Sequence, residues 1–319
     1  MARVRGRFAP SPTGALHLGG LATALFAWAS AKKQGGAVVL RVEDLDRARV
    51  VRGSLDEQLA DLAWAGLSFD EAVVIQSERI GLYEAAIRSL DARGHVYACD
   101  CSRADLRAAD ASIGAPHAGE EGRRYAETCR AAPKGRAFKR PPAVRVAIPD
   151  GRTRFMDGVR GEQTEDVRAI TGDFVLRRGD GVFAYQLAVT VDDALMGITE
   201  VVRGSDLAPS AARQVCLMNL LDFPRNNDAP CPTYLHVPLV TGEGGAKLSK
   251  RDGGFAVASY RERGITPQRL VAAIARAYGQ DVSDHDPLAS LAESFDAARF
   301  PAHDVPLGRI GIKLPGLTG

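Results

Sequence analysis

Two periods of apolar residues alternate in the first hundred residues. Residues 4–8 form a strand-like segment, and the short apolar run at residues 37–42 has the composition of a buried parallel strand. Apolar residues recur at helical spacing over residues 20–33, and two further helices are predicted, one opening at Ser54 and one over residues 77–93. Strands alternating with helices of this length predict a Rossmann-like α/β fold with a doubly wound parallel sheet.

Local signals predict where these elements begin and end. Ser54 is followed three positions later by Glu57, the spacing of a capping box at a helix N-terminus. Gly35-Gly36 closes the first helix, and Gly94 stops the third. Glu43 falls at the carboxyl end of the strand at residues 37–42, the edge at which open α/β sheets bind ligands.

The pattern changes after Tyr97. Residues 99–142 hold three cysteines and segments rich in Ala, Gly and Glu, which is typical of an inserted, loop-rich domain. Strands are expected at residues 144–148 and 174–176, and the apolar run at residues 182–191 is expected to be another buried strand. Helices are expected after Lys250 as far as about Leu291, and the Gly- and Pro-rich tail at 305–319 is expected to be poorly ordered.

These changes divide the chain into four predicted segments. Residues 1–98 would form the first half of the parallel-sheet domain, 99–178 an inserted domain, 179–240 the second half of the sheet, and 241–319 a basic loop, a small helical region and a flexible tail.

Composition and charge fit an ordinary globular protein. The 319 residues are 45% hydrophobic and 25% charged, with a net charge of +2, so a nucleic-acid surface would be a local patch. The basic run at residues 134–140 is one candidate for that patch, and an ordinary solvated loop is the alternative. The five cysteines do not form a secretory disulfide pattern, and no long apolar run predicts a membrane span. A cytoplasmic monomer is therefore expected.

A Gly-rich turn stands where the first strand gives way to the first helix. Gly14, Gly19 and Gly20 bracket His17 there. Glycines let the backbone approach a nucleotide closely, and a helix N-terminus offers unpaired N–H groups to phosphate. His17 can also donate to a phosphate oxygen. A Gly-rich turn by itself is about as often a simple tight connection between two elements as it is a nucleotide-binding site.

A second Gly-rich segment, at residues 241–246, leads into Lys247-Leu248-Ser249-Lys250. Two ammonium groups on a mobile loop can close over a triphosphate and neutralise charge as pyrophosphate leaves. Without other signals, a solvated basic loop is the commoner interpretation.

In this order, the two motifs resemble the HIGH and KMSKS signatures of class I aminoacyl-tRNA synthetases, with HIGH written as His17-Leu18-Gly19-Gly20. The resemblance implies formation of an aminoacyl-adenylate from ATP with Mg²⁺, with His17 and Lys250 as catalytic residues. The implied ATP-binding residues are His17, Gly19, Gly20, Lys247, Ser249 and Lys250.

Four further motifs, at residues 7–14, 41–46, 185–193 and 197–206, resemble the glutamate branch of this family. The resemblance implies that Arg7 and Arg203 bind the side-chain carboxylate of L-glutamate, and that Ser11, Glu43 and Tyr185 bind its α-amino and α-carboxylate groups. Arginine pairs bidentately with carboxylates, and a carboxylate suits an ammonium group. The full implied glutamate-binding set is Arg7, Phe8, Ala9, Pro10, Ser11, Glu43, Tyr185 and Arg203.

The cysteines at positions 99, 101 and 129 are either three free thiols or three ligands of a tetrahedral Zn²⁺. A metal would stabilise a loop-rich insertion with a thin apolar core. The family resemblance supplies Tyr125 as fourth ligand, so the implied set is Cys99, Cys101, Tyr125 and Cys129, holding one structural zinc per chain. His117 is the competing fourth ligand.

The Cys-x-Cys…Tyr-x-x-x-Cys pattern resembles a short branch of the glutamyl family that modifies queuosine. The 68 residues after Arg251 allow a small helical stem-contact region and not an anticodon-binding domain of ordinary size. The resemblance implies tRNA-independent glutamate activation and transfer of glutamate to the queuosine base at the wobble position of tRNA(Asp).

Three alternatives remain at this stage. One is a truncated glutamyl-tRNA synthetase that charges the 3′ end of tRNA(Glu); the others are a small-molecule adenylate-forming ligase and a catalytically inactive RNA-binding protein. For the transfer step no general base can be assigned. Asp192, Asp193 and Asp206 are near the expected site, but each is equally well explained as a helix cap or loop ligand.

Overall fold

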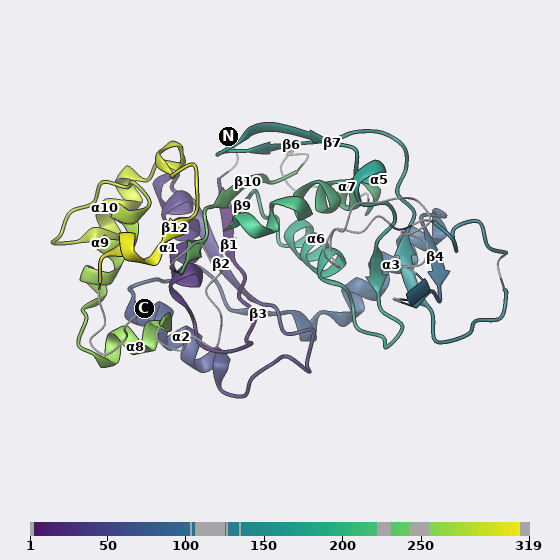
Figure 1. Cartoon of the computed structure of the whole chain (residues 1–319), viewed down its shortest axis with the longest axis horizontal. Coiled ribbons are helices and arrows are strands. Elements are labelled where there is room, and N and C mark those ends of the chain that lie inside the picture. Colours follow the sequence, from purple (N-terminus) through teal and green to yellow (C-terminus); the bar gives the residue numbers. More distant parts are fainter. Residues whose placement is uncertain are drawn as a thin grey trace.

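The structure, a computed structural model, describes residues 3–102, 104–105, 125, 127–133, 135–221, 231–242 and 255–312. Within these residues seven strands form a central sheet in the order β3-β2-β1-β9-β10-β6-β7 (Figure 1). Every neighbouring pair is parallel except β6 and β7. The strands are β1 (Arg5–Phe8), β2 (Ala37–Val42), β3 (Val74–Ile75), β6 (Thr153–Asp157), β7 (Gly161–Glu165), β9 (Glu200–Gly204) and β10 (Thr233–Val237). The predicted parallel α/β architecture is confirmed.

Helices cover both faces of this sheet (Figure 1). One apolar core lies between the sheet and α1, α9 and α10, and the other between the sheet and α3, α6 and α7. Successive residues of one strand supply opposite cores, because side chains alternate along a strand: Val39 faces the second core and Leu40 the first. The helices are α1 (Leu18–Lys33), α2 (Ser54–Trp64), α3 (Ile80–Ala92), α5 (Val167–Ile170), α6 (Tyr185–Leu195), α7 (Ala211–Leu221), α8 (Val257–Glu262), α9 (Pro267–Ala277), α10 (Pro287–Ser294) and α11 (Leu307–Ile310).

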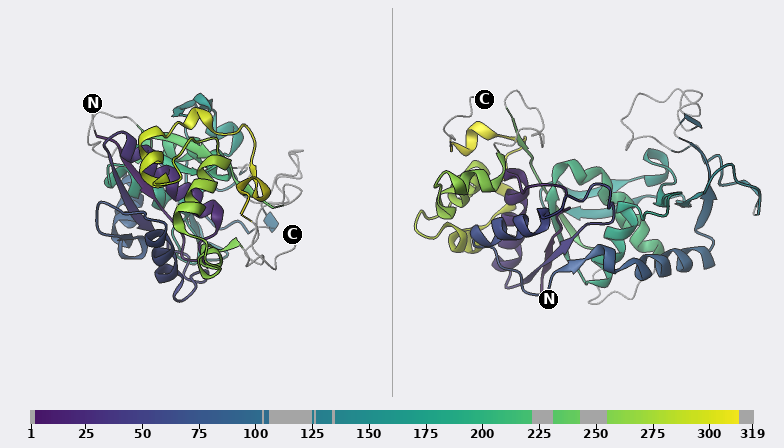
Figure 2. Two further views of the ribbon diagram at one scale, coloured as in Figure 1. Left: turned by 90° about the vertical axis from the view of Figure 1, so that its left-hand side faces the viewer. Right: turned by 90° about the horizontal axis from the view of Figure 1, so that it is seen from below.

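A smaller antiparallel sheet lies at the opposite end of the molecule from α8, α9 and α10 (Figures 1 and 2). It contains β4 (Val96–Cys99), β5 (Ala143–Val146) and β8 (Val175–Arg177) in that order. Strands β6 and β7 fall between β5 and β8 in the sequence, yet they extend the central sheet through β10. The range predicted as an insertion therefore contributes strands to both sheets, and its boundaries stay a prediction.

The strand expected at residues 182–191 is wrong, because α6 occupies Tyr185–Leu195. Its residues from Leu187 to Asp193 are all buried, so the segment lacks the polar face that marks an amphipathic helix. A short apolar run has the same appearance in a buried strand and in a buried helix, and only packing separates them.

Two other expectations are corrected. Gly53, not Ser54, is the N-cap of α2, and the Ser54 hydroxyl contacts another loop. The described part of the tail, residues 305–312, is ordered: β12 (Val305–Pro306) pairs with β11 (Val240–Thr241), and α11 follows it. Val305 is fully buried against the first core, which explains why a Gly- and Pro-rich segment is fixed there.

No helix in the described part of the chain is long and apolar enough to span a membrane.

Candidate active site

A cavity of about 600 Å³ opens at the carboxyl ends of β1, β2, β9 and β10. Its walls include all eight residues predicted to bind glutamate, together with three predicted to bind ATP. These are Arg7, Phe8, Ala9, Pro10, Ser11, Glu43, Tyr185 and Arg203, and His17, Gly19 and Gly20. Lys247, Ser249 and Lys250 lie outside the described residues. Residues that are far apart in the sequence thus share one pocket at the edge where parallel sheets bind ligands.

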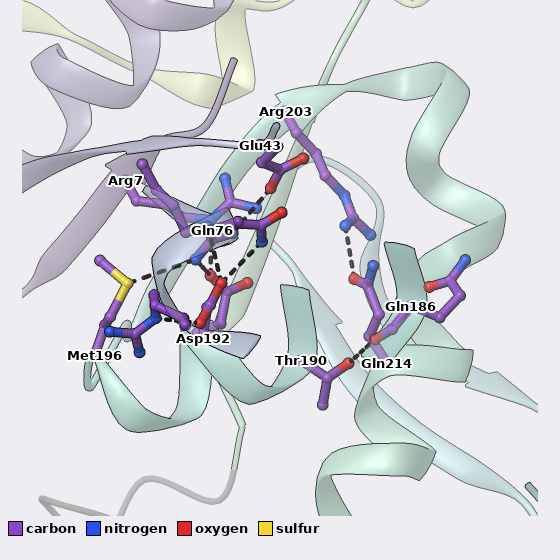
Figure 3. A network of polar contacts seen from close by, with 12 residues as sticks. Arg7, Glu43, Gln76, Gln186, Thr190, Asp192, Met196, Arg203 and Gln214 are labelled. Atoms are coloured by element: carbon purple, nitrogen blue, oxygen red, sulfur yellow. Dashed lines mark hydrogen bonds and ion pairs between the residues drawn. The ribbon is translucent and has the colours of Figure 1, made fainter. Parts of the chain in front are cut away.

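Beneath this pocket, a buried charged cluster links β1 and β2 to α6 (Figure 3). Arg41 is fully buried and donates to Asp193 at 2.6 Å and to Glu43 at 3.1 Å. Arg7 reaches the same Asp193 oxygen at 3.3 Å and donates to the carbonyl of Val202 at 3.1 Å. Asp193 therefore joins Arg7 to Arg41, and Arg41 in turn holds Glu43 in the pocket wall.

Two carboxylates of the cluster, Glu43 and Asp193, have pKa values shifted in opposite directions. Burial raises the pKa of Glu43, and the nearby Arg41 and Arg7 charges only partly oppose this. Burial by itself would also raise the pKa of Asp193, but the Arg41 and Arg7 charges hold it below its ordinary value. Asp193 is thus a fixed anion, whereas Glu43 gains from a cationic ligand such as an ammonium group.

Asp192 completes the charged cluster on the inner side of α6. It accepts a hydrogen bond from Gln76 at 2.8 Å (Figure 3). It also accepts from Arg79 at 2.6 Å and from the Tyr83 hydroxyl at 2.8 Å. Both Asp192 and Asp193 lie inside α6 and are buried, so neither is a helix cap. Of the three carboxylates considered for the transfer step, only Asp206 lines the cavity.

Arg203 approaches the pocket from β9. Its Nε donates to His236 at 3.1 Å. Its Nη1 donates to the Gln214 side chain at 2.7 Å (Figure 3). Its guanidinium carbon also lies 4.9 Å from the centre of the Tyr234 ring. The position of this buried arginine is therefore fixed by contacts on several sides.

His17 is the N-cap of α1, and its Nδ1 accepts a hydrogen bond from the backbone N–H of Gly20 at 3.1 Å. Because Nδ1 is the acceptor, the proton of a neutral His17 is on Nε2. A Cβ at position 19 would lie 3.2 Å from the His17 ring, so glycine there leaves space for the imidazole. The geometry offers a ring N–H donor beside the positive end of a helix.

The loop before His17 is held by α2. Gly14 has a φ of 136°, a conformation that L side chains rarely adopt. Its N–H donates to the Ser54 hydroxyl at 3.0 Å, and its carbonyl accepts from Ser54 at 2.8 Å and from Gln58 at 2.7 Å. Ser54 and Gln58 were not predicted to contribute to the site, and the apparent capping box concealed this contact.

The chain also returns to His17 after the KMSKS-like segment. Ala256 forms a β-bridge with His17, and the Val257 N–H donates to the Leu16 carbonyl at 2.8 Å. Before that segment, Val240 of β11 lines the cavity. The described residues on both sides of residues 243–254 therefore lie beside the cavity wall that contains His17.

The cysteine cluster lies at the end of β4, in the part of the molecule that contains the smaller antiparallel sheet. The sulfur atoms of Cys99, Cys101 and Cys129 lie within 4.8 Å of one another. The buried Tyr125 hydroxyl is 3.4 Å from the Cys99 sulfur and 3.9 Å from the Cys101 sulfur. Tetrahedral zinc with bonds of ~2.3 Å needs sulfur atoms about 3.8 Å apart. The predicted set of three thiols and a phenol therefore has the size and chemistry of a zinc site; the competing ligand, His117, lies outside the described residues.

Residues of the predicted basic patch also support this cluster. Arg136 forms an ion pair with Asp100 and lies 3.4 Å from the Cys129 sulfur, and its guanidinium stacks on Phe138. Arg136 is thus engaged in a local structural role, while Lys134 lies outside the described residues.

The fold and the pocket define the catalytic core of a class I aminoacyl-tRNA synthetase. A family model described as "tRNA synthetases class I (E and Q), catalytic domain" matches residues 3–297. Among solved structures, a glutamate tRNA ligase from Elizabethkingia meningosepticum in complex with its amino acid superposes with a TM-score of 0.81 at 29% identity, covering 97% of this chain and 68% of that one.

Curated relatives narrow the assignment. The glutamyl-Q tRNA(Asp) synthetase of Geobacter sulfurreducens is 47% identical over 87% of this chain and 85% of its own length. That of Symbiobacterium thermophilum is 42% identical over 94% of each chain. The chain therefore belongs to the class I glutamyl and glutaminyl synthetase family and, within it, to the glutamyl-Q tRNA(Asp) synthetases.

Proposed function

We propose that this enzyme activates L-glutamate with ATP, without needing tRNA, and transfers the glutamate to the queuosine base at the wobble position of tRNA(Asp). The observation that carries the proposal is the convergence of Arg7, Glu43 and Arg203 on one pocket beside His17. Two arginines suit the side-chain carboxylate of glutamate, and the carboxylate of Glu43 suits its ammonium group. The relatives that match most of the chain are named for the same acceptor.

The first step joins glutamate to AMP. An oxygen of the glutamate α-carboxylate attacks the α-phosphorus of ATP, and the bond to pyrophosphate breaks. The Nε2–H of His17 donates to a phosphate oxygen, and Lys250 supplies positive charge to the departing pyrophosphate. Mg²⁺, held by the phosphates of ATP, would add charge neutralisation. Gly19 and Gly20, with Lys247 and Ser249, complete the proposed ATP contacts.

The pocket orients glutamate for this attack. Arg7 and Arg203 bind the side-chain carboxylate, while Ser11, Glu43 and Tyr185 bind the α-amino and α-carboxylate groups. In the second step a hydroxyl of the queuosine cyclopentene ring attacks the mixed anhydride and releases AMP. Of Asp192, Asp193 and Asp206, only Asp206 lines the cavity, and we propose that it accepts the hydroxyl proton.

Cys99, Cys101, Tyr125 and Cys129 hold one structural zinc in this proposal. Four protein ligands fill a tetrahedral site and leave no position for a substrate. The metal therefore stabilises the small sheet near β4 and takes no part in the chemistry. We place the reaction in the cytoplasm, where the tRNA substrate occurs, and expect a monomer.

The decisive experiment compares acceptors. The protein is incubated with labelled glutamate, ATP and one of three purified RNAs: tRNA(Asp) with queuosine, tRNA(Asp) without it, or tRNA(Glu). Only the first should become labelled, and glutamate-dependent exchange of pyrophosphate into ATP should proceed with no RNA present.

The similarity to a glutamate tRNA ligase supports one alternative, charging of the 3′ end of tRNA(Glu). Labelling of tRNA(Glu), or equal labelling of tRNA(Asp) with and without queuosine, would establish that alternative and reject the proposed acceptor.

A further inference from the structure

A chain of three buried side chains runs across β9, β10 and β6 and ends at the glutamate pocket. Arg203 and His236 are register partners on neighbouring strands, and the Arg203 Nε lies 3.1 Å from the His236 Nε2. On the other side of the ring, the His236 Nδ1 lies 2.5 Å from an Asp157 carboxylate oxygen. All three residues are at most 4% exposed.

The hydrogen bonds determine which nitrogen of His236 carries the proton. An arginine Nε always bears hydrogen and can only donate, so the His236 Nε2 must accept. The remaining proton is therefore on Nδ1, where it is donated to Asp157. Burial lowers the pKa of His236, which favours the same neutral ring.

Asp157 is itself held in one orientation. Its other carboxylate oxygen accepts from the backbone N–H groups of Val159 at 2.9 Å and Arg160 at 3.2 Å. Burial alone would raise the pKa of Asp157, but the hydrogen bonds from His236 and this backbone keep it below its ordinary value. An ionised Asp157 accepts on both oxygens and cannot donate to His236.

This arrangement leaves both N–H groups of the Arg203 Nη2 without a partner among the described residues, so that nitrogen can donate to a ligand. The Nε of Arg203 is taken by His236 and its Nη1 by Gln214, whereas Nη2 is buried with no hydrogen-bond partner among the described residues. Arg203 lines the cavity, and Figure 3 shows its guanidinium group beside the side chain of Gln214. A buried unsatisfied donor at a ligand site is explained by a ligand acceptor.

We infer that Asp157 and His236 are positioning residues, which fix the guanidinium of Arg203 so that Nη2 faces the side-chain carboxylate of glutamate. This inference rests on the proposed function, because it takes Arg203 as a glutamate-binding residue. Neither residue is expected to touch the substrate; they act by setting the tautomer of one imidazole. A carboxylate that fixes a histidine tautomer is a known device in enzyme sites.

The substitution Asp157→Asn tests the tautomer. The two backbone N–H groups retain the Asn oxygen in the place of the present acceptor, so the Asn NH₂ group faces the His236 Nδ1. His236 must then accept at Nδ1 and carry its proton on Nε2, which opposes the N–H of Arg203. The KM for glutamate should rise about 10- to 100-fold, the usual range for losing a charge-assisted hydrogen bond. The KM for ATP should stay within about twofold.

Nitrogen-15 NMR of the ring gives a readout that does not depend on substrate. The wild-type His236 should show its proton on Nδ1, and the Asp157→Asn variant should show it on Nε2. The chain has six histidines, so the signal can be assigned with His236→Gln. An imidazolium or an Nε2–H tautomer in the wild-type protein would overturn the inference.

Three further variants separate a positioning role from a purely structural one. His236→Gln keeps an oxygen that can accept from Arg203 and should raise the glutamate KM less than His236→Phe, which has no acceptor. Met156→Gln changes the exposed neighbour of Asp157 in β6 and is the control. It should change neither the KM for glutamate nor the KM for ATP.

Arg203→Ala separates failure of the proposed glutamate-binding role of Arg203 from failure of the positioning inference alone. If it leaves the glutamate KM unchanged, the proposed role of Arg203 is wrong. If it raises that KM while Asp157→Asn and His236→Phe do not, only the positioning inference fails.

Discussion

The charged cluster under the pocket and the cysteine cluster near β4 are both buried polar groups, but they balance charge differently. The charged cluster contains Arg7, Arg41, Arg79, Glu43, Asp192 and Asp193, so three cations and three anions of the protein neutralise one another. The cysteine cluster contains Cys99, Cys101, Tyr125 and Cys129, and all four side chains can give electron pairs to one cation. The first is organised by folding alone, whereas the second would be completed by the proposed zinc.

This difference matters for function. The pocket must be formed before glutamate arrives, because preorganised charges lower the cost of binding. Fixed ion pairs hold the charged groups of the pocket in place. The cysteine cluster packs in a small apolar cluster, so a bound metal would add more to its stability. Three predictions test the contrast, from the largest expected effect to the smallest.

Substituting Arg41 should have the largest effect on the stability of the fold. Arg41→Met keeps much of the side-chain volume but leaves Asp193 and Glu43 without their central cation, so the free energy of unfolding should fall by about 3–5 kcal/mol. Urea denaturation measures this change. Arg5→Met, which removes the exposed ion pair with Glu71, is the matched control and should cost less than about 1 kcal/mol. Equal costs for the two variants would mean that the charged cluster does not organise the core.

Removing zinc should destabilise the protein without altering glutamate binding. Elemental analysis should find one zinc per chain, and a strong chelator or the substitution Cys129→Ser should remove it. If free zinc stands at about 100 times its Kd, its loss lowers the free energy of unfolding by about 2.7 kcal/mol. The KM for glutamate in pyrophosphate exchange should stay within about twofold, since the pocket is formed by other elements.

Cys231→Ser is the matched control for zinc binding, because Cys231 lies outside the cysteine cluster and packs against the second core. It should retain the metal. A protein that contains no zinc as purified, or a Cys231→Ser variant that loses it, would contradict the assigned ligands.

The smallest effect expected is a pH dependence of glutamate binding. Glu43 must be ionised to pair with the ammonium of glutamate, and burial raises its pKa. As pH falls through that pKa, the ionised fraction drops and the KM for glutamate should rise by up to about tenfold per pH unit. Steady-state exchange assays between pH 5 and 8 measure the profile. The Glu43→Gln variant should bind weakly with a flat profile; a wild-type-like slope in that variant would place the titrating group elsewhere.

Parts of the site were predictable from the sequence and parts were not. The first sheet strands and α1 follow from periodicity, because apolar residues must reach the core at the spacing of their element. The helix α6 was taken for a strand, since burial on nearly all sides removes the period that identifies a helix. Arg41 inside an apolar strand and the pair Asp192-Asp193 inside an apolar helix were the available signals for the charged cluster.

The contacts of Ser54, Gln58, Asp157 and His236 left no comparable signal. Each of these residues is common in caps, turns or cores, and its role depends on which distant segment packs beside it. Ser54 bonds to a loop 40 residues away, and His236 bonds to an aspartate 79 residues away.

The sequence by itself determined the chemistry of this protein. His17 with its glycines, Arg7, Glu43 and Arg203 stand in short motifs, and motif residues that bind ligand directly can be identified one at a time. Tertiary structure alone decided how those charges are held. Arg41 and Asp193 are 152 positions apart, and only the packing of α6 on the sheet brings them to 2.6 Å. Periodicity is a local property of the chain, whereas charge pairing within a core depends on which segments meet.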